Sequence, residues 1–320
     1  MAKAIEVSGL TKYYDGLAAV DGINFEVEEG EIFGFLGPNG AGKTTTIRML
    51  TGLSKPTSGS ARVLGYDISS EIVRAKKGFG VVPELSNMYD ELTGLDNLVF
   101  MGQLYGVPFR ERQTRAEELL KTFGLYERKD SRFATYSRGM KRALTIAAAL
   151  VHRPRLLFFD EPTVGLDVVA ARNLRTLIQR LRNEGITVFL TTHYLEEADI
   201  LCSRIALLVK GKIIATDTSD RLKTMAEEKP VLEIAFKAPL PQVAEELRQR
   251  LPGTVVMGVN DKVRVYGGDT AMVLEAVLKH AKETGTEVAS VNSLKPTLED
   301  AFVKLTGLSP LVMATEKGGR

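Results

Sequence analysis

Cysteine, long apolar runs and excess charge of either sign are all scarce in this sequence, and each scarcity excludes a class of protein. The single cysteine, Cys202, excludes a disulfide framework and a clustered cysteine metal site, and it fits a reducing compartment. The 42 basic and 40 acidic residues leave a net charge of +2, which argues against a protein built mainly to grip nucleic acid. No stretch reaches the ~18–20 uninterrupted apolar residues that a membrane span needs, so any spans would belong to another polypeptide.

A targeting segment is not evident either. Residues 1–10 alternate apolar and polar side chains and lack the apolar core of a signal peptide. The 320 residues suffice for one large or two ordinary domains, and 44% hydrophobic with 26% charged residues is typical of a soluble globular chain. We therefore expect a cytoplasmic protein with a sizeable core.

The pattern of residues 1–225 predicts an α/β fold. Short apolar strands alternate with helical segments, and continuous apolar runs such as residues 156–159 are typical of strands buried on both faces. Such alternation implies a parallel sheet with helices packed on it. The predicted strands are residues 5–8, 23–27, 32–36, 156–159, 186–190, 204–209 and 212–216, and the predicted helices are 43–51, 117–123, 143–151 and 170–183.

A second domain is predicted at residues 230–308, after a charged run that meets a proline. Strands are expected at 231–236, 254–259, 262–266 and 287–291, with the turn Asn260-Asp261, and helices at 242–250 and 271–284. This βαββαβ order is the ferredoxin-like plan of a small α+β domain. A last helix is expected at 297–305, and the polar tail at 309–320 is expected to be disordered.

A phosphate-binding loop is predicted where strand 32–36 meets helix 43–51. The motif G-x-x-x-x-G-K-[ST] fits without exception, and its glycines let successive backbone N–H groups point at phosphate oxygens. The helix N-terminus adds a favourable dipole. Lys43 is expected to reach the β- and γ-phosphates, and Thr44 to place its hydroxyl on Mg²⁺. The predicted nucleotide-binding residues of this loop are Gly37, Pro38, Asn39, Gly40, Ala41, Gly42, Lys43, Thr44 and Thr45.

Two carboxylates follow the apolar strand at 156–159. Asp160 is expected to hold Mg²⁺, directly or through water. Glu161 lies one residue further, where the chain leaves the strand, and is predicted to act as the general base that polarises the attacking water.

Further segments resemble motifs of the ATP-binding cassette (ABC) family. Residues 136–142, which read Tyr-Ser-Arg-Gly-Met-Lys-Arg, resemble the ABC signature, and residues 162–167 resemble the D-loop. Residues 80–84 resemble the Q-loop, and residues 191–193 end in a switch histidine. The resemblance covers about residues 3–220. It implies a P-loop NTPase cassette: a mixed sheet with helices, an antiparallel β subdomain and a helical subdomain at about residues 85–150.

The resemblance also implies a shared site between two cassettes paired head to tail. Ser137 and Gly139 would bind the γ-phosphate of ATP held by Lys43 of a second cassette, with Asp167 close by in the D-loop. His193 would bond the γ-phosphate and orient Glu161 and the water. The remaining roles are Tyr14 stacked on adenine, with Tyr13 as its competitor, and Glu84 as a Q-loop contact to Mg²⁺.

Two residues depart from the family pattern. Glu84 replaces the usual Q-loop glutamine and adds negative charge near the phosphates. Arg138 replaces the first signature glycine, where its side chain would either crowd the partner's nucleotide or help to hold phosphate.

Two regions outside the nucleotide motifs point to partners. In the family the helical subdomain touches a separate transmembrane permease subunit, and Met88, Tyr89, Leu92 and Tyr105 are candidate docking residues or ordinary core. Residues 296–307 resemble the closing helix of exporters of the drug-resistance and sodium-efflux type. We expect the second domain to support pairing or docking.

The resulting prediction is an ATP-hydrolysing subunit of an ABC exporter, peripheral on the inner face of the membrane through its permease. It would pair with a second cassette, either identical or different. The alternative is a non-transport ABC ATPase of DNA maintenance or translation. The short span between Lys43 and Ser137 leaves no room for the coiled coil of chromosome-type proteins, and translation-type proteins usually carry two cassettes. A regulator without turnover is disfavoured by Asp160, Glu161 and His193.

Overall fold

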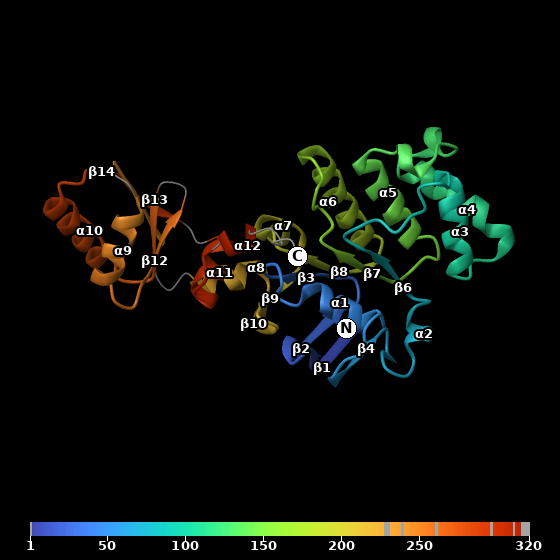
Figure 1. Cartoon of the computed structure of the whole chain (residues 1–320), viewed down its shortest axis with the longest axis horizontal. Coiled ribbons are helices and arrows are strands. Elements are labelled where there is room, and N and C mark those ends of the chain that lie inside the picture. Colours follow the sequence, from blue (N-terminus) through green and yellow to red (C-terminus); the bar gives the residue numbers. More distant parts are fainter. Residues whose placement is uncertain are drawn as a thin grey trace.

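The computed structural model describes residues 2–226, 231–237, 240–259, 262–294, 297–309 and 311–314. Figure 1 shows a large cassette and a smaller domain beside it. The linker at 227–230 and the Asn260–Asp261 turn predicted above lie outside the described residues. Within the described residues, no helix combines the length and the apolar character that crossing a membrane requires.

The cassette is built on a six-stranded sheet of order β10-β9-β3-β8-β7-β6. Its strands are β3 (Ile32–Leu36), β6 (Phe79–Val82), β7 (Leu156–Asp160), β8 (Thr187–Thr192), β9 (Arg204–Val209) and β10 (Lys212–Asp217). All pairs are parallel except the edge pair of β9 and β10. Because parallel strands share a carboxyl edge, Leu36 lies opposite Thr192 and Asp160 opposite Thr191.

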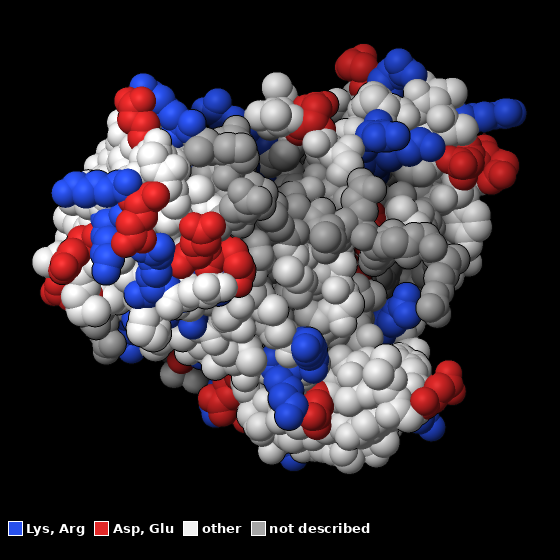
Figure 2. Space-filling view, turned by 60° about the vertical axis from the view of Figure 1, so that its left-hand side comes forward, with Lys and Arg blue, Asp and Glu red and all other residues white. Residues whose placement is uncertain are grey.

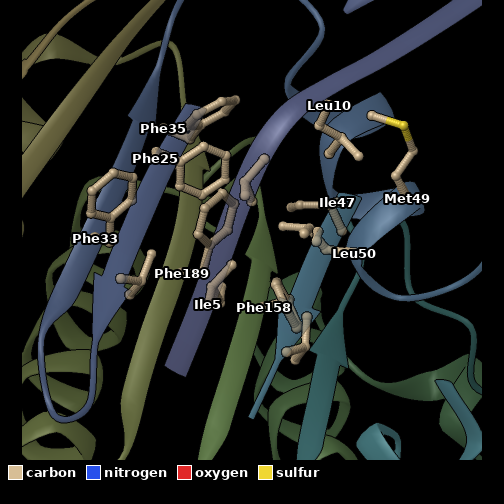
Figure 3. Packing of buried hydrophobic residues seen from close by; sticks show 14 of the residues in the cluster. Ile5, Leu10, Phe25, Phe33, Phe35, Ile47, Met49, Leu50, Phe158 and Phe189 are labelled. Carbon is tan, nitrogen blue, oxygen red and sulfur yellow. The ribbon is translucent and has the colours of Figure 1, made fainter. Parts of the chain in front are cut away.

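A four-stranded antiparallel sheet of order β2-β1-β4-β5 covers one side of this layer. It contains β1 (Lys3–Tyr14), β2 (Leu17–Glu28), β4 (Ser58–Val63) and β5 (Tyr66–Asp67). The phenylalanines of both sheets interlock in one core, with the Phe25 and Phe33 ring centroids 5.6 Å apart (Figure 3). The first helix, α1 (Lys43–Leu50), packs its buried Met49 and Leu50 into the same core.

The helical subdomain packs α3 (Gly94–Leu104), α4 (Phe109–Thr122) and α5 (Arg138–Ala149) around a second core. The sequence reading missed α3, although Thr93 and Asp96 form a cap at its start: Thr93 Oγ1 accepts from the Asp96 backbone N–H at 3.0 Å. The other cassette helices are α2 (Ile72–Ala75), α6 (Val168–Asn183), α7 (Leu195–Leu201) and α8 (Ser219–Ala226), with 3-10 turns at Tyr126–Arg128 and Phe133–Thr135.

The smaller domain has its own sheet, of order β12-β13-β11-β14, and its own core. The strands are β11 (Val231–Phe236), β12 (Val255–Val259), β13 (Lys262–Tyr266) and β14 (Val288–Leu294), and the helices are α9 (Leu240–Arg250) and α10 (Thr270–Thr284). Along the chain these elements run β-α-β-β-α-β.

The last two helices return to the cassette. The last helices of the described residues are α11 (Leu298–Thr306) and α12 (Leu311–Ala314). The sequence groups α11 with the second domain, yet its fully buried Phe302 shares a core with Leu36 and Leu207 of the cassette. Met313 of α12 is buried in that core too, so residues 311–314 of the tail form a helix where disorder was predicted. Residue 310 and residues 315–320 of that tail lie outside the described residues.

Candidate functional site

The loop between β3 and α1 bends tightly around its glycines. A Cβ atom on Gly37 would lie 2.2 Å from the carbonyl oxygen of Leu208, and one on Gly42 would lie 2.4 Å from that of Ala19. Gly42 also has φ 107°, a conformation that side chains rarely adopt. The loop therefore curls closely against its neighbours and leaves an open cavity of about 860 Å³ in front of the α1 N-terminus. The residues that line this cavity are Ala19, Pro38, Asn39, Gly40, Ala41, Gly42, Lys43, Thr44, Thr45, Arg48, Glu84, Glu161, Val164, Gly165, His193 and Tyr194.

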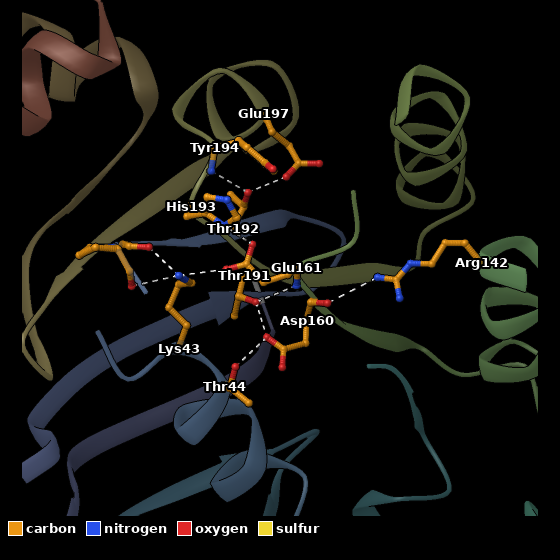
Figure 4. A network of polar contacts seen from close by, with 12 residues as sticks. Lys43, Thr44, Arg142, Asp160, Glu161, Thr191, Thr192, His193, Tyr194 and Glu197 are labelled. Carbon is orange, nitrogen blue, oxygen red and sulfur yellow. Dashed lines mark hydrogen bonds and ion pairs between the residues drawn. The ribbon is translucent and has the colours of Figure 1, made fainter. Parts of the chain in front are cut away.

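Three charged or titratable side chains meet at the floor of this cavity (Figure 4). Lys43 Nζ lies 3.0 Å from Glu161 Oε1 and also donates to the carbonyl oxygens of Gly37 and Pro38, at 2.5 and 3.2 Å. His193 Nδ1 lies 2.9 Å from the other oxygen of Glu161. The structure thus brings the predicted base and switch histidine into contact.

Burial and hydrogen bonding act in opposite directions on the two neighbouring carboxyl groups. Burial alone would raise the pKa of Glu161, but the contacts from His193 and Lys43 outweigh it and lower that pKa. For Asp160 burial prevails over the hydrogen bonds from Thr191 and Thr44, so its pKa is raised. Glu161 is accordingly held as a carboxylate, the form that a general base needs.

An oxygen-rich corner lies beside Glu161. Thr191 Oγ1 donates to Asp160 Oδ1 at 2.7 Å, and Thr44 Oγ1 donates to the same oxygen at 3.2 Å. Glu84 lines the same cavity. Hydroxyl and carboxylate oxygens are the ligands that Mg²⁺ prefers, so this donor set fits the ion. The described residues hold no group of three His, Cys, Asp or Glu side chains suited to a metal.

The signature residues lie at a different surface from this cavity. Ser137 is exposed and caps α5 by accepting from the backbone N–H of Met140 at 3.3 Å. Asp167 caps α6 in the same way, accepting from Ala170 at 2.8 Å. A Cβ on Gly139 would lie 3.7 Å from that of Ala170, so the two helix starts are neighbours. None of the three is among the residues that line the cavity.

The predicted adenine contact also lies apart from the phosphate loop. Tyr14 ends β1 and is 43% exposed, with its hydroxyl 3.4 Å from Ser54 Oγ. Tyr13 is exposed to the same degree. Neither ring lines the cavity as it stands, whereas Ala19 at the start of β2 does.

Two buried charged residues behind the site were missed in the sequence. Arg142 of α5 donates to backbone carbonyls of Pro83, Glu84, Asp160 and Pro162. The sequence indicated Arg142 only as a charged residue on the apolar face of α5, among alanine, leucine and isoleucine side chains.

The second missed residue is Glu197 of α7. Thr192 Oγ1 donates to Glu197 Oε2 at 2.6 Å, directly before the switch histidine. Burial raises the pKa of Glu197. Its sequence signal is weak, because acidic residues in a first helical turn are common on the surface.

Comparison with known protein sequences gives a consistent result. The family described as "ABC transporter" matches residues 20–164. The daunorubicin/doxorubicin resistance ATP-binding protein DrrA of Streptomyces peucetius is 39% identical, over 95% of this chain and 93% of that protein. The linearmycin resistance ATP-binding protein LnrL of Bacillus subtilis (strain 168) is 35% identical, over 95% and 98% respectively.

Solved structures show the same likeness in three dimensions. An ATP-binding subunit of an ABC transporter is 32% identical, with a TM-score of 0.64, over 69% of this chain and 92% of that one. A dimeric post-hydrolysis state of an ATP-binding cassette bound to ADP and Pi is 26% identical, with a TM-score of 0.61, over 67% and 98%. The predicted cassette fold, with its mixed sheet and helices, is thereby confirmed.

Proposed function

The chain belongs to the ABC transporter family, and from this membership we propose that it is the ATP-hydrolysing subunit of an exporter whose membrane-spanning part is a separate polypeptide. The observation that carries the proposal is the contact of Glu161 with both Lys43 and His193 in front of a phosphate-binding loop. Two relatives that match almost the whole chain are named as drug-resistance ATP-binding proteins, which supports export.

Hydrolysis needs Lys43 to change partners. When a triphosphate enters the loop, its β- and γ-phosphate oxygens compete with Glu161 for the Lys43 ammonium group. Glu161 is then free of its ion pair but still contacts His193, which orients it toward an attacking water. The Glu161 carboxylate accepts the proton of that water in the transition state, while His193 keeps the carboxylate oriented.

Thr44, Asp160 and Glu84 are the residues that would hold Mg²⁺ in this site. A bound ion would offset the charge that develops on the phosphates. Asp160 is suited to this role because Thr44 and Thr191 fix its carboxylate at the edge of the cavity. Glu84 would contribute a second carboxylate where the family usually has an amide.

Pairing of two cassettes would complete the site. Ser137 and Gly139 lie at the N-terminus of α5, where backbone N–H groups and the helix dipole favour an anion. Because they lie outside this chain's own cavity, we propose that they bind the γ-phosphate of ATP held by a second cassette. Asp167 lies beside them at the start of α6, and Tyr14 would stack on adenine. The second cassette is either a copy of this chain or a different one.

The permease would dock on the helical subdomain. Beside Glu84, Leu85 is 81% exposed and Tyr89 is 49% exposed, so apolar surface is available close to the nucleotide site. We propose that this surface meets a membrane subunit on the cytoplasmic side and thereby places the protein at the inner face of the membrane. The face drawn in Figure 2 carries interspersed basic and acidic side chains, which does not favour the alternative of nucleic-acid binding.

The test is to look for a membrane-protein gene beside the gene for this chain and to co-express the two proteins. We expect the two to purify together and the complex to hydrolyse ATP in a Mg²⁺-dependent way, faster in the presence of its cargo. A purified complex that hydrolyses no ATP would contradict the enzyme assignment. ATP turnover by the chain with no membrane protein bound in cells would instead favour a non-transport ATPase.

A further inference from the structure

Arg142 is a buried cation behind the nucleotide site. It belongs to the first turns of α5, the helix that Ser137 caps, and is only 9% exposed. Figure 4 shows its guanidinium pointing from α5 toward the end of β7, where Asp160 and Glu161 lie. Burial lowers its pKa to about 10, so the group remains charged at neutral pH.

The guanidinium is satisfied by backbone carbonyls rather than by a carboxylate. Nε donates to Pro162 at 3.0 Å, and Nη2 donates to Asp160 at 3.4 Å. Nη1 makes a short hydrogen bond to Pro83 and a longer one, 3.4 Å, to Glu84. Asp160, Glu197 and Glu84 attract the guanidinium electrostatically, and its hydrogen bonds orient peptide groups of two separate loops.

Two of these carbonyls flank the catalytic carboxylate. Asp160 and Pro162 are the residues directly before and after Glu161, whose φ of 47° lies in the left-handed region. Such a backbone conformation costs ~1–3 kcal/mol and persists only where its surroundings impose it. On the other side of the strand end, Thr191 accepts from the Glu161 backbone N–H, with its carbonyl oxygen 3.2 Å away. Arg142 therefore holds the peptide group directly before Glu161 and the one that follows Pro162.

We propose that Arg142 is a positioning residue for ATP hydrolysis: it aligns Glu161 with the loop that carries Glu84 and with the helix that carries Ser137. This inference rests on the proposed function, because Ser137 meets ATP only in a paired cassette. A shift of α5 on pairing is transmitted through one rigid guanidinium to the backbone of Glu161 and to the Glu84 loop. Through Arg142, Glu161 is correctly placed for catalysis only when the start of α5, the Glu84 loop and the end of β7 are correctly aligned with one another.

Arginine is required for this arrangement. Its planar fork presents donors in three directions, and they reach residues on both loops here. Lysine keeps the charge but offers its donors from a single atom, so it cannot reach all of these carbonyls. Arg142→Lys is therefore the informative variant, because it preserves the charge and most of the side-chain volume while removing some of the hydrogen bonds to the four carbonyls.

The experiment compares Arg142→Lys with Arg115→Lys in the full chain. Arg115 is a matched control: it lies on α4 of the same subdomain and donates to the Leu150 carbonyl at 3.3 Å, away from the nucleotide cavity. We expect Arg142→Lys to lower kcat by about 10²-fold, the cost of misplacing a catalytic group by about 1 Å, with ATP affinity nearly unchanged. Arg115→Lys should hydrolyse ATP at the wild-type rate.

A double mutant separates positioning from general damage. On a Glu161→Gln background, Arg142→Lys should cost little further turnover, because both changes act through the same carboxylate. Losses that multiply fully in the double mutant, or a kcat of Arg142→Lys equal to that of the wild type, would overturn the proposal. Loss of ATP affinity in Arg142→Lys would also overturn it.

Amide hydrogen exchange tests the same inference without turnover. Peptides that cover residues 83–86 and 160–167 should exchange faster in Arg142→Lys than in the wild type and in Arg115→Lys. If the wild-type chain fails to hydrolyse ATP, the proposed function is wrong. The exchange measurement still tests whether Arg142 holds the two loops in place. Unchanged exchange in both segments would refute it.

Discussion

Lys43 Nζ and Glu161 Oε1 lie 3.0 Å apart, both side chains being almost fully buried, so the phosphate-loop cation and the proposed base form an ion pair. A buried ion pair is costly to break by removal of one partner, because the other charge is left uncompensated. Triphosphate is the natural replacement for Glu161 as the partner of Lys43. The ion pair therefore keeps both groups charged and oriented.

Replacement of Lys43 should abolish nucleotide binding. Lys43→Ala removes the ammonium group that reaches the β- and γ-phosphates and leaves Glu161 buried with only His193 as a polar partner outside the backbone. We expect no ATP binding by calorimetry and a lower melting temperature. Lys3→Ala, at the exposed start of β1, should keep both at wild-type values. Near-normal ATP affinity of Lys43→Ala would show that this loop is not the phosphate-binding loop.

Replacement of the base should separate binding from hydrolysis. Glu161→Gln keeps shape and hydrogen bonding but is a poor base, so turnover should fall ~10²–10⁴-fold while ATP still binds. The variant should sediment as a dimer with ATP and as a monomer without it. Wild-type turnover by Glu161→Gln would show that another group is the base.

The signature should act across the pair. If the partner is a second copy, a mixed dimer can form from one Lys43→Ala chain and one Ser137→Arg chain. Because each site combines the phosphate loop of one chain with the signature of the other, both substitutions then affect the same one of the two sites. The other site stays intact, so the mixture should regain ATPase activity that each homodimer lacks. Full activity of a strictly monomeric chain in sedimentation would contradict the shared site.

Glu197 should make stability depend on pH in a predictable direction. Its pKa in the folded chain is raised, chiefly by burial, above the unfolded value of about 4.3. The stability that protonated Glu197 contributes to the folded chain is fully present below the pKa of the unfolded chain. It is lost as the pH rises through the pKa of the folded chain. Glu197→Gln cannot ionise, so its free energy of unfolding should fall less than that of the wild type between pH 4 and pH 8.

Denaturant titrations at several pH values measure this difference, with exposed Glu196→Gln as the control. The control should follow the wild-type curve at every pH. Parallel curves for Glu197→Gln and the wild type would show that Glu197 ionises without penalty in the folded chain.

The return of α11 should matter to the cassette. Phe302 is fully buried in a core shared with Leu36 and Leu207, so Phe302→Ala should destabilise the cassette by about 3–5 kcal/mol. Met272→Ala, on the exposed side of α10, should change the melting temperature little. The readout is thermal unfolding of the cassette with and without ATP. An unchanged melting temperature for Phe302→Ala would mean that α11 docks too weakly to hold the two domains together.

The sequence by itself determined the phosphate loop and the strand that ends in Asp160 and Glu161. Each of these features is contiguous in the chain, and local chemistry dictates it: glycines where a Cβ would collide, and apolar residues that bury a parallel strand. The family resemblance of residues 3–220 has the same local basis, since its motifs are short and uninterrupted.

Tertiary structure alone decided which distant residues meet. The pairing of Lys43 with Glu161, the four carbonyls around Arg142, and the docking of Phe302 against the cassette all join segments far apart in the sequence. Arg142 and Phe302 lie in segments that resemble family motifs, but neither resemblance identifies the partners of these two side chains. Only the register of the parallel strands and the crossing of the chain between domains bring these partners together, because burial selects contacts by shape and area rather than by sequence spacing.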